Sequence, residues 1–138
     1  MFRVSREIDF CYGHRLLNYD GKCRFLHGHN GRAVITLQAE VLDARGMVLD
    51  FSDIKRVVSD WIEGNLDHRM ILNREDPILP VLDRMGEPVF VTDVNPTAEN
   101  IAKLIHDFAQ TQGFPVVQTE LWETPRCYAT YRPTRDAL

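Results

Sequence analysis

The sequence predicts an α+β fold in which antiparallel strands carry helices on one face. Two stretches in which apolar and polar residues alternate, about 2–14 and 30–43, come first in the chain. Two helical stretches occupy its middle, and two short strands, about 116–123 and 127–131, come last. Strands grouped in pairs around a helical middle are typical of hairpins with helices on one face, and not of alternating strand–helix units.

The first two strands are predicted from the parity of their apolar residues. In 2–14 the apolar residues occupy even positions, and His14 continues this series, so we expect His14 on the apolar side. In 30–43 the apolar residues, from Ala33 to Val41, occupy odd positions. A polar stretch joins the two strands and contains several cysteine and histidine residues.

Capping residues and apolar spacing predict the two helices. Asp50 or Ser52 caps the first, whose apolar residues recur at i, i+3, i+4, i+7 and i+8 over 54–62. Asn95 or Thr97 caps the second, with Pro96 suited to the first turn.

Other segments carry weaker signals. His106 falls off the apolar stripe of the second helix, so we expect it at the surface. The stretch 66–73 has no clean period, and 89–91 is expected to form a short strand. Cys11 and Cys127 lie in strand segments near aromatic residues and are expected to be small core residues.

Composition limits the class of protein. A chain of 138 residues is expected to form one domain, 1–138. A net charge of −4 argues against a nucleic-acid or membrane surface. Three widely spaced cysteines favour a reducing cytoplasm over a disulfide framework. Charged residues within the first nine positions do not fit a signal peptide, and no apolar run approaches the roughly 20 residues that span a bilayer. We therefore expect a cytoplasmic location.

Three histidines are candidate metal ligands. His27 and His29 stand at i and i+2, which puts both side chains on one face of an extended strand. They share the odd parity of the second strand, and His14 ends the first, so the three imidazoles are expected to converge. Three protein ligands with an open fourth position describe a catalytic zinc site. The alternative is a set of hydrogen-bonded core histidines.

Further residues are candidates for chemistry near that site. Cys23 precedes His27 by four residues, and a nearby cation would favour its thiolate. Asp67-His68 suggests a base supported by a carboxylate, or else a turn cap beside an exposed histidine. Glu123 shares the parity of Leu121, and a carboxylate there suits the adjacent N–H donors of an aminopyrimidine ring; the alternative is a solvated edge glutamate.

These segments, in this order, resemble the 6-pyruvoyl-tetrahydropterin synthase family, including its queuosine-pathway branch, 6-carboxy-tetrahydropterin synthase. The resemblance implies a tunnelling fold (T-fold), a four-stranded antiparallel sheet with two helices inserted after the second strand. It also implies homo-oligomers, trimers that close a barrel and commonly pair into hexamers. The matching segments are Gly13-His14-Arg15-Leu16, Cys23-x-x-x-His27-Gly28-His29, Leu66-Asp67-His68, Asn95-Pro96-Thr97-Ala98-Glu99-Asn100 and Trp122-Glu123-Thr124.

The resemblance also implies a role for each matching site residue. Cys23 resembles the thiol that moves protons on the substrate side chain, and Asp67 and His68 resemble its acid/base partners from an adjacent subunit. Glu123 resembles the anchor of the pterin ring, and Thr97 adds a contact to the ring or pocket. The zinc ligands are implied to be His14, His27 and His29.

The implied substrate is 7,8-dihydroneopterin triphosphate or a related dihydropterin. The pattern of the biopterin-forming enzymes has five residues between the thiol and the first histidine. In this chain three residues separate Cys23 from His27, which resembles the queuosine-pathway branch. This implies a zinc-dependent lyase that releases triphosphate and acetaldehyde and forms 6-carboxy-5,6,7,8-tetrahydropterin. The alternatives are a 6-pyruvoyl-tetrahydropterin synthase, a zinc-stabilised pterin-binding module without turnover, and a hydrolase that uses zinc-bound water. Where family members often have two small residues before the first histidine, this chain has Tyr12-Gly13.

Overall fold

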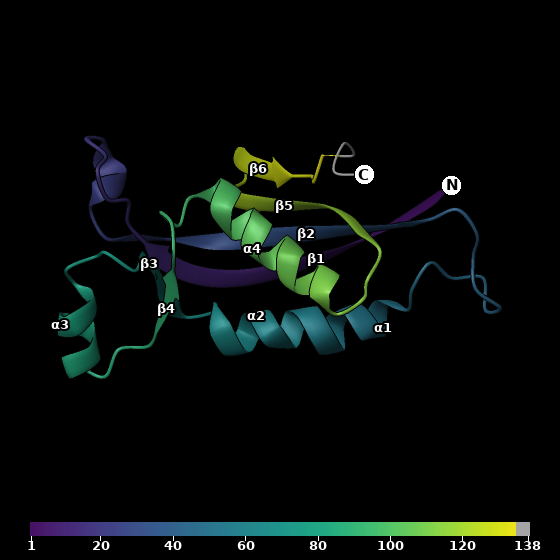
Figure 1. Cartoon of the computed structure of the whole chain (residues 1–138), viewed down its shortest axis with the longest axis horizontal. Coiled ribbons are helices and arrows are strands. Elements are labelled where there is room, and N and C mark those ends of the chain that lie inside the picture. The colour runs from purple at the N-terminus through teal and green to yellow at the C-terminus, as the bar shows by residue number, and fades with distance from the viewer. Residues whose placement is uncertain (135–138) are drawn as a thin grey trace.

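A six-stranded sheet with the strand order β4-β3-β1-β2-β5-β6 forms the framework of the protein (Figure 1). The computed structural model describes residues 1–134. The strands are β1 (Phe2–His14), β2 (His27–Ala39), β3 (Arg69–Asn73), β4 (Val89–Thr92), β5 (Val116–Thr124) and β6 (Cys127–Tyr131). The helical segments are η1 (Lys22–Arg24), α1 (Phe51–Ile54), the π-helical η2 (Lys55–Ser59), α2 (Asp60–Asn65), α3 (Leu79–Arg84) and α4 (Ala98–Thr111).

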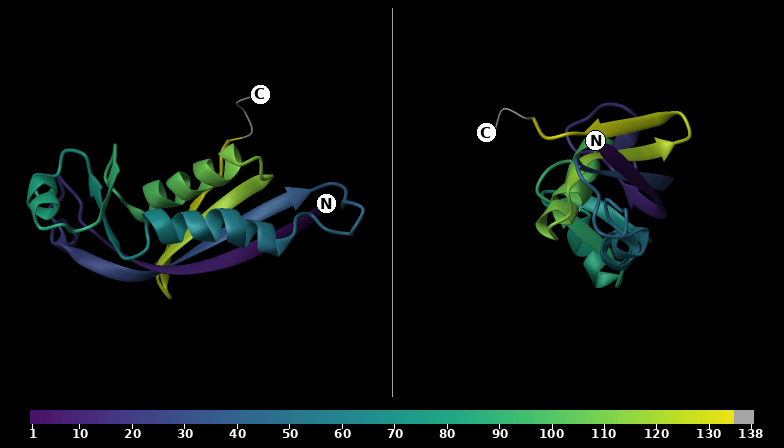
Figure 2. Two further views of the ribbon diagram at one scale, coloured as in Figure 1. Left: turned by 90° about the horizontal axis from the view of Figure 1, so that it is seen from below. Right: turned by 90° about the vertical axis from the view of Figure 1, so that its right-hand side faces the viewer.

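The predicted α+β class and the four antiparallel strands are confirmed. β1, β2, β5 and β6 pair antiparallel to one another. The continuous run from α1 to α2 lies beside α4 on the same face of the curved sheet (Figures 1 and 2). Two short strands extend the predicted sheet, because β3 pairs parallel with the end of β1 and β4 pairs parallel with β3. The short strand expected at 89–91 is β4, whereas β3 and the helix α3 were not predicted.

The register of the first hairpin brings the two ends of its strands together. β1 and β2 pair continuously from Phe2 opposite Ala39 to His14 opposite His27. β2 therefore begins three residues earlier than the predicted 30 and ends at Ala39, so that its histidines lie in regular strand. The predicted parity is confirmed, because the buried apolar residues of this hairpin share one face: Ile8, Phe10, Tyr12, Ala33, Ile35 and Leu37.

Both helix starts lie where capping residues were predicted. The Asp50 carboxylate accepts a hydrogen bond from the Ser52 N–H at 2.9 Å, and the Thr97 hydroxyl accepts one from the Asn100 N–H at 3.2 Å. Each cap satisfies a backbone donor that the first helical turn leaves free. None of the helices within 1–134 is long and apolar enough to cross a membrane.

Two expectations about single residues are wrong. His106 is fully buried, because α4 is covered by β5 and β6 as well as by the first helical run. Its Nδ1 lies 3.1 Å from the Thr119 hydroxyl, and its ring meets Tyr131 edge-on. Cys127 is exposed and Cys11 is only half-buried, so neither is a fully buried core residue. Cys127 begins the edge strand β6.

The burial of His106 predicts a loss of stability in mild acid. Burial lowers the pKa of His106 more than the neighbouring Asp107 raises it. Below the unfolded value of about 6.5, the unfolded chain therefore binds the proton more readily, and stability falls as the pH falls. We expect urea unfolding to show a larger drop in stability between pH 7 and pH 5 in the natural protein than in the variant His106→Gln. An equal drop in stability in the natural protein and in His106→Gln would contradict a lowered pKa of His106.

Candidate metal centre and active site

The three predicted histidines converge at one end of the β1–β2 hairpin. His14 ends β1, while His27 and His29 open β2 on the same face. One nitrogen of each ring lies within 4.8 Å of those of the other two, and the ring centroids are 4.5–5.2 Å apart. The rings are inclined to one another by 56–88°, so they meet by their edges and do not stack. This is the arrangement in which imidazoles share one cation.

Backbone carbonyl groups fix the tautomers of two of these rings. His14 Nδ1 lies 2.7 Å from the Pro96 carbonyl oxygen, and His27 Nδ1 lies 2.7 Å from that of Phe25. A carbonyl oxygen only accepts, so both Nδ1 atoms carry the proton and both Nε2 atoms keep a lone pair. Metal-binding histidines are held in this way by a second partner that orients the ring.

The electrostatics of His14 favour the neutral ring that a metal requires. Burial is the main cause that lowers its pKa to about 4, and His27 and His29 lower it further, against the effect of the Pro96 carbonyl. Among the described residues, the Nε2 atoms of His14 and His29 are buried and have no hydrogen-bond partner. Buried polar atoms are rarely left unpaired. A divalent cation bound by these lone pairs would satisfy them, so the residues fit a zinc ion.

Glu123 faces this cluster from β5. Its carboxylate oxygens lie 4.0 Å from His14 Nε2 and 3.8 Å from His29 Nε2, and its side chain is 25% exposed. Glu123 therefore reaches both the histidines and solvent. A carboxylate in this position can neutralise a bound cation or accept hydrogen bonds from a ligand held beside it.

Tyr12 lies within the same cluster, beside His14 and His29. Its ring meets His14 edge-on and lies across Gly31, where a Cβ atom would approach Tyr12 Cε1 to 2.8 Å. Burial raises the pKa of Tyr12 far above its ordinary value, and the Glu123 carboxylate adds to this. The hydroxyl is buried and unpaired among residues 1–134.

An unpaired buried hydroxyl costs free energy, so its removal is expected to stabilise the protein. We expect Tyr12→Phe, which keeps the ring, to raise the free energy of unfolding by about 1 kcal/mol. Chemical denaturation measures the change, with Tyr128→Phe at a side chain that is 53% exposed as the neutral control. A clear loss of stability in Tyr12→Phe would mean that the hydroxyl has a partner.

Asp67 and His68 form a second cluster just before β3. His68 Nδ1 donates to Asp67 Oδ2 at 2.8 Å, and Asp67 Oδ1 accepts from the Cys11 N–H at 2.9 Å. The His68 side chain is 79% exposed, whereas the Asp67 side chain is 25% exposed. The pair is therefore hydrogen-bonded as a base with its carboxylate, and the imidazole faces outward. Its third member is Cys11, which the sequence did not suggest.

Cys23 belongs to neither cluster within the described chain. It lies on η1 as a half-buried free thiol, and its carbonyl accepts a hydrogen bond from the Leu16 N–H at 2.8 Å. This bond ties η1 to the segment that follows His14. The structure thus places Cys23 on the loop between the two ligand-bearing strands, but it does not bring the thiol to Asp67 and His68 of the same chain.

The segment before α4 has a supporting role that sequence patterns did not reveal. The Thr97 hydroxyl caps α4, and the preceding Pro96 carbonyl orients His14. The Asn95 side chain accepts from the Leu17 N–H at 3.0 Å and donates to the Leu17 carbonyl at 2.8 Å. This pair of bonds holds the loop after His14 against the start of α4. A long-range contact of this kind leaves no periodic signal in the sequence.

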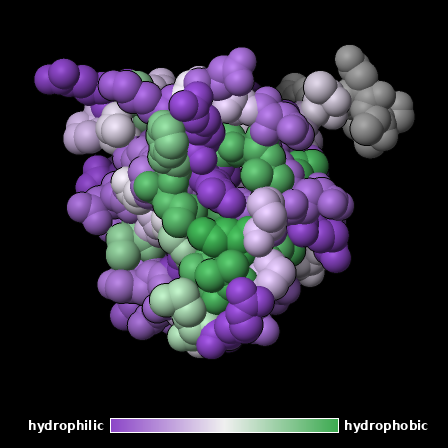
Figure 3. Space-filling model, turned by 90° about the vertical axis from the view of Figure 1, so that its left-hand side faces the viewer, coloured by the Kyte–Doolittle hydropathy of each residue, from purple (hydrophilic) through white to green (hydrophobic). Residues whose placement is uncertain are grey.

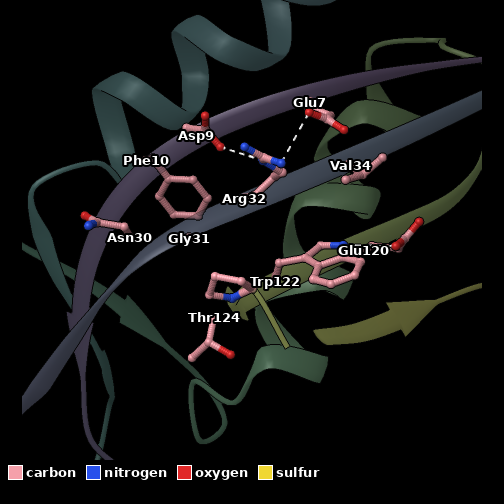
Figure 4. Close-up of a pocket in the computed structure, with 11 residues that line it drawn as sticks. Glu7, Asp9, Phe10, Asn30, Gly31, Arg32, Val34, Glu120, Trp122 and Thr124 are labelled. Carbon is pink, nitrogen blue, oxygen red and sulfur yellow. Dashed lines mark hydrogen bonds and ion pairs between the residues drawn. The ribbon is translucent and has the colours of Figure 1, made fainter. Parts of the chain in front are cut away.

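Another cavity lies away from the histidines, on the face of the sheet opposite the helices. Figure 4 shows this space, about 680 Å³, with Arg32 between Glu7 and Asp9. Trp122 also lines it, and the indole N–H donates to Glu120 at 3.1 Å. Arg32 pairs with the carboxylates of Glu7 and Asp9, Glu120 accepts hydrogen bonds from Trp122 and Gln118, and none of the predicted site residues lines this cavity. The histidine cluster is therefore the stronger candidate for chemistry.

Comparison with known proteins identifies the family. Residues 3–134 match the family model described as 6-pyruvoyl tetrahydropterin synthase. The 6-carboxy-5,6,7,8-tetrahydropterin synthase of Rickettsia typhi is 37% identical over 135 residues, which cover 93% of this chain and 98% of that protein. The Haemophilus influenzae protein of the same name is 31% identical over 96% of this chain and 99% of its own.

Solved structures agree on the fold. An uncharacterized protein from Wolinella succinogenes superposes with a TM-score of 0.80 at 28% identity, covering 96% of this chain and 98% of that chain. The 6-pyruvoyl tetrahydropterin synthase of Caenorhabditis elegans superposes with a TM-score of 0.72 at 24% identity over 96% of each chain, which supports the fold alone. The predicted tunnelling fold is confirmed, and the chain belongs to the 6-pyruvoyl tetrahydropterin synthase family.

Proposed function

We propose that this protein is a zinc-dependent lyase that converts 7,8-dihydroneopterin triphosphate and one water to 6-carboxy-5,6,7,8-tetrahydropterin, triphosphate and acetaldehyde. Membership of a family of tetrahydropterin synthases supports a pterin-directed lyase. The names of the relatives from Rickettsia typhi and Haemophilus influenzae favour the 6-carboxy product. The observation that carries the proposal is the cluster of three imidazoles beside Glu123, two of them with tautomers fixed by backbone carbonyl groups.

The three histidines would hold the zinc ion through their Nε2 atoms. Two of the rings already direct Nδ1–H to backbone carbonyl groups, so their Nε2 lone pairs need no change of tautomer. When bound, zinc supplies Lewis acidity, which lowers the pKa values of side-chain hydroxyls and of the neighbouring C–H groups of the substrate.

The remaining residues hold the substrate and move protons. Glu123 would bind the pterin ring by accepting two N–H hydrogen bonds. Cys23, on the loop beside the ligands, would take the proton from the substrate side chain. His68 donates Nδ1–H to Asp67, which leaves its Nε2 free to exchange protons. Because His68 faces outward and Cys23 is not in its cluster, we propose that His68 serves the site of an adjacent subunit.

Open edges and an apolar end support assembly into trimers or pairs of trimers. β3 pairs with β1 only from Tyr12 to His14, so within residues 1–134 the outer edge of β1 before Tyr12 is open, and β6 forms the opposite edge of the sheet. Open edges of this kind pair with other strands. Apolar residues also gather in a band on the end that carries α3 and β4 (Figure 3). The exposed large apolar residues of the segments at this end include Phe25, Leu26, Val81, Met85, Val91 and Val94.

We also propose a cytoplasmic location. The three cysteines are free in the described structure, and a reducing compartment keeps such thiols free.

Product analysis tests the proposed reaction. Zinc-loaded protein is incubated with 7,8-dihydroneopterin triphosphate, and the products are separated by mass. The proposal predicts 6-carboxy-5,6,7,8-tetrahydropterin together with acetaldehyde. A 6-pyruvoyl product without acetaldehyde would instead support the second branch of the family, and unchanged substrate that stays bound would support a binding module. A ring-opened product would indicate hydrolysis.

Glu123→Gln tests the proposed pterin anchor. The amide offers one acceptor where the carboxylate offers two charged ones, so we expect the affinity for unsubstituted pterin to fall about 10- to 100-fold. Fluorescence titration measures the affinity, and metal analysis of the same sample serves as the control. Unchanged pterin affinity together with a loss of zinc would make Glu123 a metal ligand and refute the anchor role.

A further inference from the structure

The cluster of Cys11, Asp67 and His68 has a metal-binding composition, and the proposed reaction uses only its Asp67–His68 pair, to move protons. A thiol, a carboxylate and an imidazole each offer one donor atom, and these atoms all lie within 4.8 Å of one another. Thiolate, imidazole and carboxylate are the donors that zinc accepts, and thiolate in particular selects softer cations over magnesium or calcium. The zinc chemistry proposed above involves only the imidazoles of His14, His27 and His29.

Backbone bonds hold this cluster in place before any ion binds. The Cys11 N–H donates to Asp67 Oδ1 at 2.9 Å, and the His68 N–H donates to the Cys11 carbonyl at 2.7 Å. These two bonds fasten the loop that ends α2 to the strand β1. His68 adopts a φ of 58°, a left-handed conformation that non-glycine residues rarely take, and the bond to Cys11 holds it there. The Asp67 carboxylate and the backbones of Cys11 and His68 are thus held in place.

The cluster is also open to ions from solvent. Cys11 and His68 line a second cavity, of about 620 Å³, which His27 and His29 also line. The His68 side chain is 79% exposed, so a hydrated cation can reach the imidazole without opening the fold. Both Asp67 oxygens accept one hydrogen bond each and keep further lone pairs for a metal.

We propose that Cys11, Asp67 and His68 form a second, weaker site for a soft divalent cation such as zinc. Binding releases the thiol proton of Cys11 to solvent and uses one nitrogen of His68. If Nε2 binds the ion, that nitrogen is occupied; if Nδ1 binds it, the ring proton moves to Nε2. In either case His68 no longer has a free Nε2 to accept a proton. It follows that zinc in excess occupies this site and inhibits the lyase; this part of the proposal rests on the proposed function.

Titration of the metal-free protein with cobalt(II) tests the site without turnover. Cobalt bound by histidines alone gives no sulfur-to-cobalt charge-transfer band, whereas a thiolate ligand gives one in the near ultraviolet. We expect the band to develop after the first equivalent of cobalt, once the three histidines are filled. Cys11→Ser should still bind the first equivalent of cobalt but should not show the band. Cys23→Ser and Cys127→Ser should bind the first equivalent and also show the band.

A variant of the exposed ligand His68 tests the site even if Cys11→Ser does not fold. His68→Gln changes a side chain that is 79% exposed, and we expect it to weaken the second cobalt equivalent at least about tenfold. Absence of the near-ultraviolet band in the natural protein, or its persistence in Cys11→Ser, would overturn the proposal. Equal affinity of His68→Gln and the natural protein for the second equivalent of cobalt would also overturn the proposal.

The inhibition is measured separately. With 7,8-dihydroneopterin triphosphate, zinc beyond the first equivalent should slow the natural protein and leave Cys11→Ser unaffected. Equal inhibition of both would overturn the regulatory part. If the substrate is not converted at all, the proposed function fails, and the cobalt band still decides whether the second metal site exists.

Discussion

Cys23→Ala is expected to lower kcat by about 10²- to 10⁴-fold, which is the usual contribution of a positioned acid or base. The substitution removes the proposed proton acceptor and leaves the histidine cluster intact, since Cys23 lies outside it. Zinc content and pterin affinity should therefore stay at the natural level. Steady-state kinetics with 7,8-dihydroneopterin triphosphate, together with metal analysis, separates the chemical step from binding.

Cys127→Ala is the matched control for this substitution. Cys127 is an exposed free cysteine on the edge strand β6, remote in sequence from the ligands, and its loss should leave kcat unchanged. Natural turnover by Cys23→Ala would remove the thiol from the mechanism and favour an incidental role for it. A loss of zinc in this variant would show instead that the thiol binds the metal.

His29→Ala is expected to abolish both tight zinc binding and turnover. His29 Nε2 is buried and has no hydrogen-bond partner within 1–134; of the three such histidine nitrogens, those of His14 and His29 lie in the cluster and that of His106 lies outside it. Even the outer partners of metal ligands contribute about 10- to 100-fold in affinity, so removing a ligand should cost roughly 100-fold or more. Competition with a chromophoric chelator measures the zinc affinity directly.

His106→Gln is the matched control for this second substitution. It also removes a buried imidazole, but one that contacts Thr119 and Tyr131 and lies outside the cluster. We expect its zinc affinity to equal that of the natural protein. If His29→Ala binds zinc as tightly as His106→Gln does, the three histidines are not the primary metal site.

The convergence of the histidines was predictable because strand parity is a local property. Alternation in the first strand placed His14 on the apolar side, and the odd positions of the second strand placed His27 and His29 there too. The antiparallel register then brings the ends of the two strands together. Parity likewise placed Glu123 on the face that carries the cluster.

Contacts between distant segments could not be predicted in this way. β3 and β4 are short parallel strands, and their pairing depends on where the loop after α2 returns to β1. His106 is buried because β5 and β6 cover a second side of α4, which the apolar stripe of a single helix does not reveal. The proximity of Cys11 to Asp67 and His68 also results from this parallel return, and nothing in the local sequence indicates it.

Anomalous X-ray diffraction at the zinc edge, from crystals of the zinc-loaded protein, tests the central claim most directly. We predict one dominant peak at the end of the β1–β2 hairpin, about 2.0–2.1 Å from a ring nitrogen of each of the three histidines. If the rings point apart with no peak between them, or if the dominant peak lies only at Cys11, Asp67 and His68, the metal centre proposed for this enzyme does not exist.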